Sequence, residues 1–404
     1  MEQTQSSPPV PDKILNANFI KIWFGQLFYM LNLSSFNLLP YFLELRGASP
    51  DLYGQVMGSM GISNLICLIL LARRADVWSR KGTVLFWFGA SLLGNLIAIW
   101  AMGRPELEWY YLPRLLQGVF MALGFPLVFT WALELCPPNK RQVALAWFGI
   151  GGLLANSLGP TLTEIVLSLA GDPNNPANYL YVFIMTTVFH LMALGVFLTV
   201  DNTRADNAGG TTLGMTPLLR RRETLYTIFI GMSFGGMFGS LMSFGKNFTV
   251  HIGLEYVSVL LWAYTIGAIL SRIFIQQITR HINEVHLIPA GLLGLGLTFL
   301  LLGHSWDYWT IGAMGLFYGF SHGVLYPTLF VRFINYQQPN EMGRATSLFQ
   351  GFFAVGWGFF PMAGGTVIRV AGFTTLFSLL TAFAGICIML FLSSEKHHRN
   401  RTMK

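Results

Sequence analysis

The chain carries little charge for its length. Only 11% of its 404 residues are Asp, Glu, Lys or Arg, whereas a soluble globular domain carries about 25%. Hydrophobic residues make up 53%, and they gather in runs of roughly 20 residues, the length that a helix needs to cross a bilayer. Because these runs are continuous rather than alternating, helices are favoured over a barrel. The composition therefore excludes a soluble domain and predicts an all-α membrane protein.

Cysteines and common enzyme motifs are also scarce. The three cysteines, Cys67, Cys136 and Cys387, lie apart in or beside apolar runs, so no disulfide framework or metal site is predicted. The sequence has no His-Glu-x-x-His zinc pair and no Gly-x-Ser-x-Gly nucleophile turn. The segment Gly239–Asn247 imitates a phosphate loop, but it has one residue too many between its glycines and ends in Asn. We therefore expect no cofactor, no metal, no ATP site and no enzymatic activity. A membrane-embedded enzyme is the competing class.

The basic residues are unevenly placed. With the N-terminus inside, most of the Lys and Arg fall in cytoplasmic segments and nearby helix ends, Arg332 among them; the others are Arg46, Arg104, Arg114, Lys246 and Arg369. This bias predicts that both termini are cytoplasmic, in a plasma (inner) membrane. It also explains the net charge of +7 by contact with anionic membrane lipid, so no nucleic acid is expected as a partner. Residues 1–18 lack a cationic start followed by an apolar core, so no cleaved signal peptide is expected.

The chain repeats itself. Arg114–Pro160 aligns without a gap on Gly315–Pro361, which superposes Gly118 on Gly319 and Pro126 on Pro327. Two similar membrane halves with a site between them are the plan of many secondary transporters. The chain is accordingly expected to form twelve transmembrane helices in two pseudo-symmetric six-helix bundles, residues 1–200 and 224–404, joined by a cytoplasmic linker, 201–223. The predicted spans are Phe19–Leu43, Leu52–Leu71, Thr83–Met102, Tyr110–Leu135, Val143–Leu169, Tyr179–Val200, Leu225–Val250, Tyr256–Ile278, Val285–Gly303, Tyr308–Phe333, Ala345–Val370 and Thr374–Ser393.

Three local motifs connect this layout to a known family. Ala72–Lys81 looks like the signature loop of the major facilitator superfamily, with Asp76, Arg80 and Lys81 matching. Arg114–Gly118 matches the family's Arg-x-x-Gln-Gly motif, and Gly159–Pro160 resembles the centre of its antiporter motif, although the flanks of the latter do not fit. The chain thus resembles this superfamily, its efflux permeases in particular, over essentially its whole length. The resemblance implies a carrier that works by alternating access.

The signature loop contains the predicted gate. A carboxylate at Asp76 can pair with a guanidinium or lie at the positive end of a neighbouring helix. Together with Arg80 and Lys81, it is expected to hold the cytoplasmic side closed. The alternative is an ordinary solvated charge cluster at the membrane interface.

Two ionisable residues inside apolar runs are coupling candidates. Arg114 lies a few residues inside the predicted outer end of its helix, where a charge is costly unless it is paired or faces water, and Gln117 shares its face at i+3. Its alternative is an arginine that snorkels to the outer headgroups. Glu164 lies in the outer half of its span, and a buried carboxylate can alternate between protonated and ionised forms. Its alternative is an interfacial glutamate without a coupling role; His322 and His190 are then the next proton sites.

Polar side chains on single helix faces predict a cavity lining. We expect the solute to contact a set of such residues together with Arg114 and Gln117: Gln26, Tyr29, Asn37, Lys246, Asn247, Tyr318, His322, Gln350 and Trp357. For any one of them, a hydrogen bond between helices is the alternative.

These observations predict a secondary transporter that moves a small organic solute. The direction we expect is export of a partly hydrophobic molecule, driven by inward proton flow, by a monomer. The alternatives are proton-coupled uptake of a polar or anionic metabolite, which Arg114 and Lys246 would favour, and a transporter-like receptor.

Overall fold

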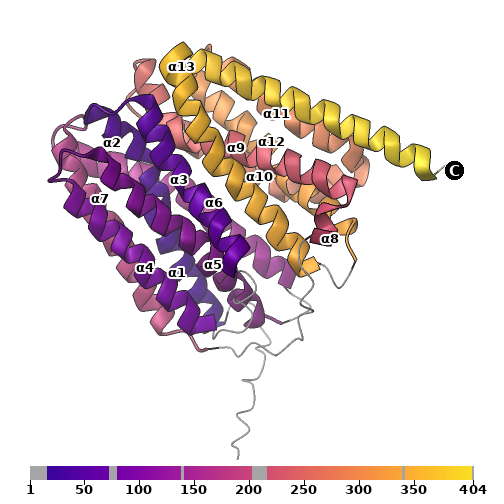
Figure 1. Ribbon diagram of the computed structural model, residues 1–404, viewed down its shortest axis with the longest axis horizontal. Coiled ribbons are helices and arrows are strands. Elements are labelled where there is room, and N and C mark those ends of the chain that lie inside the picture. Colours follow the sequence, from indigo (N-terminus) through magenta and orange to yellow (C-terminus); the bar gives the residue numbers. More distant parts are fainter. Residues whose placement is uncertain (1–15, 72–79, 138–140, 203–215, 339–341, 403–404) are drawn as a thin grey trace, which may run out of the picture. The chain divides into compact units, whose positions relative to one another are not determined.

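The computed structural model describes residues 16–71, 80–137, 141–202, 216–338 and 342–402 (Figure 1). Its longer helices are α1 Ala17–Ser35, α3 Pro50–Leu71, α4 Arg80–Ala101, α5 Tyr111–Glu134, α6 Arg141–Leu169, α7 Tyr179–Leu198, α9 Arg222–His251, α10 Ser258–His281, α11 Glu284–Leu302, α12 Tyr308–Asn335 and α13 Met342–Thr402. The shorter elements are η1 Phe36–Leu38, α2 Leu39–Leu45, η2 Leu107–Tyr110, η4 Pro176–Asn178 and α8 Thr216–Leu219.

The fold-class prediction is confirmed. No strand occurs in the described ranges, and eight helical segments within them are long and apolar enough to cross a membrane. The count of twelve spans and the two-bundle layout stay predictions.

The first predicted span is not one continuous helix. Within the predicted span Phe19–Leu43, the chain leaves α-helical geometry at Phe36–Leu38 and resumes as α2, which has Pro40 in its first turn. Proline has no N–H to donate to the carbonyl one turn back, and its fixed φ suits the start of a helix. The interruption therefore follows from Pro40, whose bending role the sequence left open.

The last two predicted spans are joined without a loop. Helix α13 runs through both, and Gly372 inside it has φ 77° and ψ 177°, a conformation that side chains with a Cβ rarely adopt. Glycine at this position thus lets the chain turn sharply between two helical segments, which Figure 1 shows as the change of direction of α13.

A capping box at Asp307, just before the first residue of α12, fixes where that helix begins. The Thr310 N–H donates to Asp307 Oδ1 over 2.7 Å, and the Thr310 hydroxyl accepts from the Asp307 N–H. These bonds to Thr310 hold the pKa of the Asp307 carboxyl below its usual value, which is the expected effect of donors that favour the ionised form.

Contacts between Cα atoms divide the chain into two compact units. Unit 1 comprises Met1–Phe36 and Ile66–Thr212, and unit 2 comprises Asn37–Leu65 and Leu213–Lys404. In unit 1, α1 packs on α6 and α7, and α4 packs on α5 and α7. In unit 2, α9 packs on α13 and on α2, and α12 packs on α10 and α11. The part of the first predicted span that follows Phe36 therefore belongs by contact to the C-terminal helices.

Candidate functional site

The Arg114 side chain is inside the protein. It lies near the start of α5 and is only 2% exposed, so it does not extend along the surface as a snorkelling arginine would. Its Nη1 donates to Gln117 Oε1 over 2.7 Å, the i+3 contact that the motif predicted. Within the described part of the chain, Arg114 Nε and Gln117 Nε2 are buried and make no hydrogen bond.

Helix α1 adds polar groups close to this pair. Tyr29 is 1% exposed, with its ring 4.2 Å from that of Phe120 between centroids. Its hydroxyl is a hydrogen-bonding neighbour of the Ser91 side chain and interacts electrostatically with Arg114. We call Tyr29, Ser91, Arg114 and Gln117 the arginine cluster. Gln26, one turn before Tyr29, is also buried, and its Oε1 is without a described partner.

A chain of hydrogen bonds runs beside the arginine cluster in unit 1. Asn95 Nδ2 donates to Asn32 Oδ1 over 2.8 Å, Asn32 Nδ2 lies 3.4 Å from His190 Nδ1, and His190 Nε2 lies 2.9 Å from the Phe88 carbonyl oxygen. Because that carbonyl only accepts, Nε2 carries the proton and Nδ1 accepts from the Asn32 amide. The histidine chain (Asn32, Asn95 and His190) thus links α1, α4 and α7 around a neutral imidazole.

Asn32 and Asn95 were missed at the sequence level. Each is a lone amide in an apolar run, and only this rarity marks it as a residue that needs a partner.

Glu164 is buried on α6, with 6% exposure. On the same helix, the Thr161 hydroxyl donates to the Ser157 carbonyl over 2.7 Å. Glu164 therefore lies within the protein rather than on its lipid-facing surface, and its coupling role stays a proposal.

Part of the predicted gate lies outside the described residues. This applies to Asp76, and for Arg80 only the backbone at the start of α4 is described. Lys81 Nζ donates to the carbonyls of Leu198 and Val200 over 2.7 and 2.9 Å. It thus binds the carbonyls at the end of α7, where helices leave acceptors unpaired.

Aromatic rings surround His322 in unit 2. His322 on α12 is 5% exposed, and its ring centroid lies 4.9 Å from both Phe234 and Phe238. Tyr318 and Tyr326, one turn away on each side, stack on it at 6.3 and 6.2 Å. Residues four apart on α12 therefore form a cluster of stacked rings around His322.

Two other predicted lining residues join this region. Gln350 Nε2 donates to the Tyr326 hydroxyl over 2.7 Å, and the Trp357 ring lies 5.4 Å from that of Phe238.

Lys246 and Asn247 make contacts that the sequence did not predict. Asn247 Nδ2 donates to Glu44 Oε2 on α2, and Lys246 Nζ donates to the Glu255 carbonyl and lies 5.5 Å from the centre of the Tyr41 ring. Asn37, also counted as a lining residue, is buried in η1 of the same unit. These residues connect the α2 region to α9.

A further ion pair joins Asp51 on α3 to Arg369 on α13. Glu44, Asp51, Asn247 and Arg369 together are called the polar clasp. No sequence pattern predicts these partners, because they are far apart along the chain.

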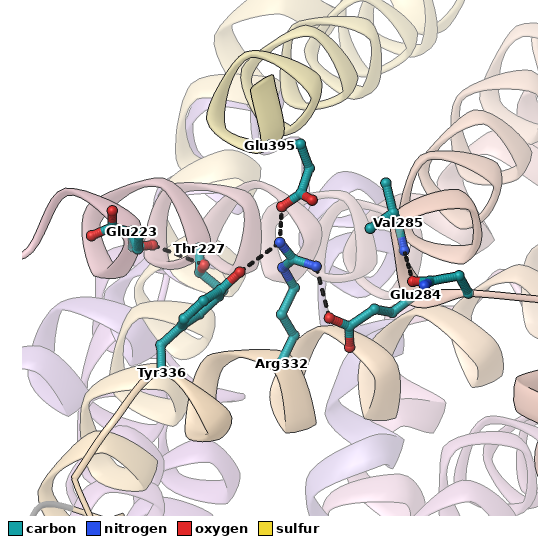
Figure 2. Close-up of polar contacts among 8 residues, drawn as sticks. Glu223, Thr227, Glu284, Val285, Arg332, Tyr336 and Glu395 are labelled. Atoms are coloured by element: carbon teal, nitrogen blue, oxygen red, sulfur yellow. Dashed lines mark hydrogen bonds and ion pairs between the residues drawn. The ribbon is translucent and has the colours of Figure 1, made fainter. Parts of the chain in front are cut away.

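Arg332 is a buried ion-pair centre rather than the surface anchor that the charge pattern indicated. It is 6% exposed and bonds Glu284 on α11 over 2.8 Å, Glu395 on α13, and the Tyr336 hydroxyl over 2.7 Å, as Figure 2 shows. Planar guanidinium groups suit such multiple pairing. Arg332 therefore ties the ends of three helices of unit 2 together.

Among the described residues, no group of three or more His, Cys, Asp or Glu side chains is arranged to hold a metal ion.

Comparisons with known proteins all point to the same family. The family model described as Major Facilitator Superfamily matches residues 22–343 and 249–403. Multidrug resistance protein 1 of Bacillus subtilis is 22% identical over 376 residues, which cover 89% of this chain and 91% of that protein. The staphylopine export protein of Staphylococcus aureus is 21% identical over 62% of this chain; the match spans 64% of that protein, less than two thirds of its length.

Among solved structures, a variant of the nucleoside transporter NupG has the same fold. Its TM-score is 0.77 at 13% identity, covering 93% of this chain and 99% of that one.

Proposed function

Because the chain belongs to the major facilitator superfamily, and is thus an integral membrane transporter of small-molecule solutes rather than an enzyme, we propose that it exports a partly hydrophobic organic solute in exchange for protons. The direction is supported by the relatives that are named for export and for drug resistance. The monomeric state, the lipid contacts and the cytoplasmic location of both termini belong to the same proposal.

The tight contact between α3 and α13 supports the proposal that the protein works by alternating access. A Cβ built on Gly58 would lie 2.6 Å from the Gly358 carbonyl oxygen, and one on Gly54 would lie 2.6 Å from that of Pro361. Only glycines allow backbones to approach so closely. The contact lies at the end that the basic residues predict to be outside, where the polar clasp joins the same region. Export requires this contact to form and break in each cycle.

Glu164 is the proposed proton site, because it is an acidic residue buried inside a predicted span. Glu164→Gln keeps the shape and the hydrogen-bonding capacity of the side chain but fixes it as neutral. In sealed proteoliposomes screened with candidate drugs, the variant should lose uphill transport driven by a pH gradient and keep solute exchange, which moves no net proton.

Glu106→Gln serves as the control, because Glu106 is exposed in a connector. If Glu164→Gln transports uphill at the parental rate, Glu164 is not the proton site. His322 and His190 are then the next candidates. If the solute instead moves inward together with protons and accumulates, the alternative is favoured, which is uptake of an anionic metabolite. Saturable binding without flux would favour a receptor.

A further inference from the structure

The arginine cluster contains a buried cation that has no anionic partner in the part of the chain that the structure describes. Arg114 makes no ion pair with any described carboxylate, and Tyr29 is the titratable group with which it interacts. An ionised group taken out of water costs several kcal/mol unless it is paired. Arg332, equally buried, has two carboxylates, so the fold does supply counter-charges where an arginine is structural.

Two donors of the arginine cluster have no acceptor among the described residues. Arg114 Nε and Gln117 Nε2 are both buried and make no hydrogen bond there. An oxyanion presents several lone pairs, whereas a neutral amide or alcohol presents fewer and carries no charge. A planar carboxylate also matches the fork of a guanidinium. These unused groups are therefore complementary to a carboxylate.

We propose that the arginine cluster binds a carboxylate group of the transported solute. This inference rests on the proposed transport function and narrows its substrate class to organic acids or zwitterions with an apolar part. The apolar part follows from the walls of the cluster, where the Tyr29 ring lies against the rings of Phe88 and Phe120 at 5.0 and 4.2 Å. The histidine chain beside it acts as a positioning element, because His190 lies edge-on to Tyr29 at 5.7 Å.

Equilibrium binding to the detergent-solubilised protein tests the proposed carboxylate site, and it needs no pH gradient. Thermal unfolding of the purified protein is followed in rising concentrations of benzoate, and in parallel of benzamide, which has the same ring and no charge. A ligand that binds the folded state raises Tm. Benzoate should raise the Tm of the parent and benzamide should not. The benzoate affinity should fall about tenfold or more in Arg114→Gln, with a smaller loss in Arg114→Lys, as expected for charged hydrogen bonds.

A second readout needs no ligand. Removing an uncompensated buried cation relieves its desolvation cost, so Arg114→Gln should keep or raise the Tm of the ligand-free protein. The matched control is Arg332→Gln, which strands Glu284 and Glu395 and should lower Tm. The proposal is overturned if Arg114→Gln lowers Tm as Arg332→Gln does, if benzoate gives no shift in the parent at millimolar concentration, or if its shift persists unchanged in Arg114→Gln.

These outcomes are independent of the transport assay. Loss of proton coupling in liposomes would refute the proposed function while leaving the benzoate shift intact. Absence of the shift together with proton-driven transport would refute only the carboxylate subsite.

Discussion

Buried polar side chains of this protein differ in what their surroundings supply. The members of the histidine chain bond to one another in series, and of its side-chain polar atoms only Asn95 Oδ1 is buried without a partner among the described residues. The arginine cluster retains unused donors. Natural structures usually pair buried polar groups, so each buried group without a partner calls for an explanation, such as a functional role or a bound ion. The first arrangement is therefore structural, and the second is the one we assign to the solute.

This difference predicts the effect of removing His190. His190→Ala leaves the buried Asn32 amide without its acceptor, which should lower the free energy of unfolding by about 1–3 kcal/mol. Denaturant unfolding in detergent measures it. Asn18→Ala is the control, because its bond to Asp201 is exposed, and it should cost little. A His190→Ala protein as stable as the control would show that the histidine chain is not structural.

At the scale of elements, glycines determine how closely helices approach. Gly58 on α3 and Gly358 on α13 face one another, whereas a Cβ at Gly89 on α4 would meet nothing within 4 Å. The same residue type is thus indispensable in one helix and replaceable in another. The difference depends on the neighbour and not on helix propensity, since glycine is unfavourable in any helix interior.

We expect Gly58→Leu to force α3 away from α13, because its Cβ would lie 2.6 Å from a carbonyl oxygen. The outer side should then open. With the native cysteines replaced, labelling of Ser243→Cys, a site 1% exposed, by an impermeant maleimide from outside should rise several-fold. Gly89→Leu carries the same added side chain and should leave labelling at the parental level. Equal labelling in the two variants would contradict an opening at this contact.

For the whole molecule, the predicted cytoplasmic gate and the α3–α13 contact should oppose one another. Asp76→Asn removes the charge that we expect to hold the cytoplasmic side closed, so the population should shift toward the inward-open state. Labelling of Ala345→Cys, buried at the start of α13, should rise from the cytoplasmic side in inverted vesicles, whereas Gly58→Leu should lower it. Asp172→Asn, in an exposed connector, is the control. Unchanged labelling and unchanged transport in Asp76→Asn would leave the solvated-charge interpretation.

The sequence by itself determined the membrane environment, the helical class and the family, because apolar run length and local motifs are properties of neighbouring residues. It also predicted that Arg114 and Gln117 share one helix face, and that Tyr318 and His322 share another, since residues three or four apart lie on the same side of a helix. Tertiary structure alone decided that Arg332 is buried between two carboxylates, that Asn95, Asn32 and His190 form one chain, and that the segment after Phe36 packs with α9. The reason is physical: a helix face shows that a side chain needs a partner, but the partner lies on another helix, and packing across the chain selects it.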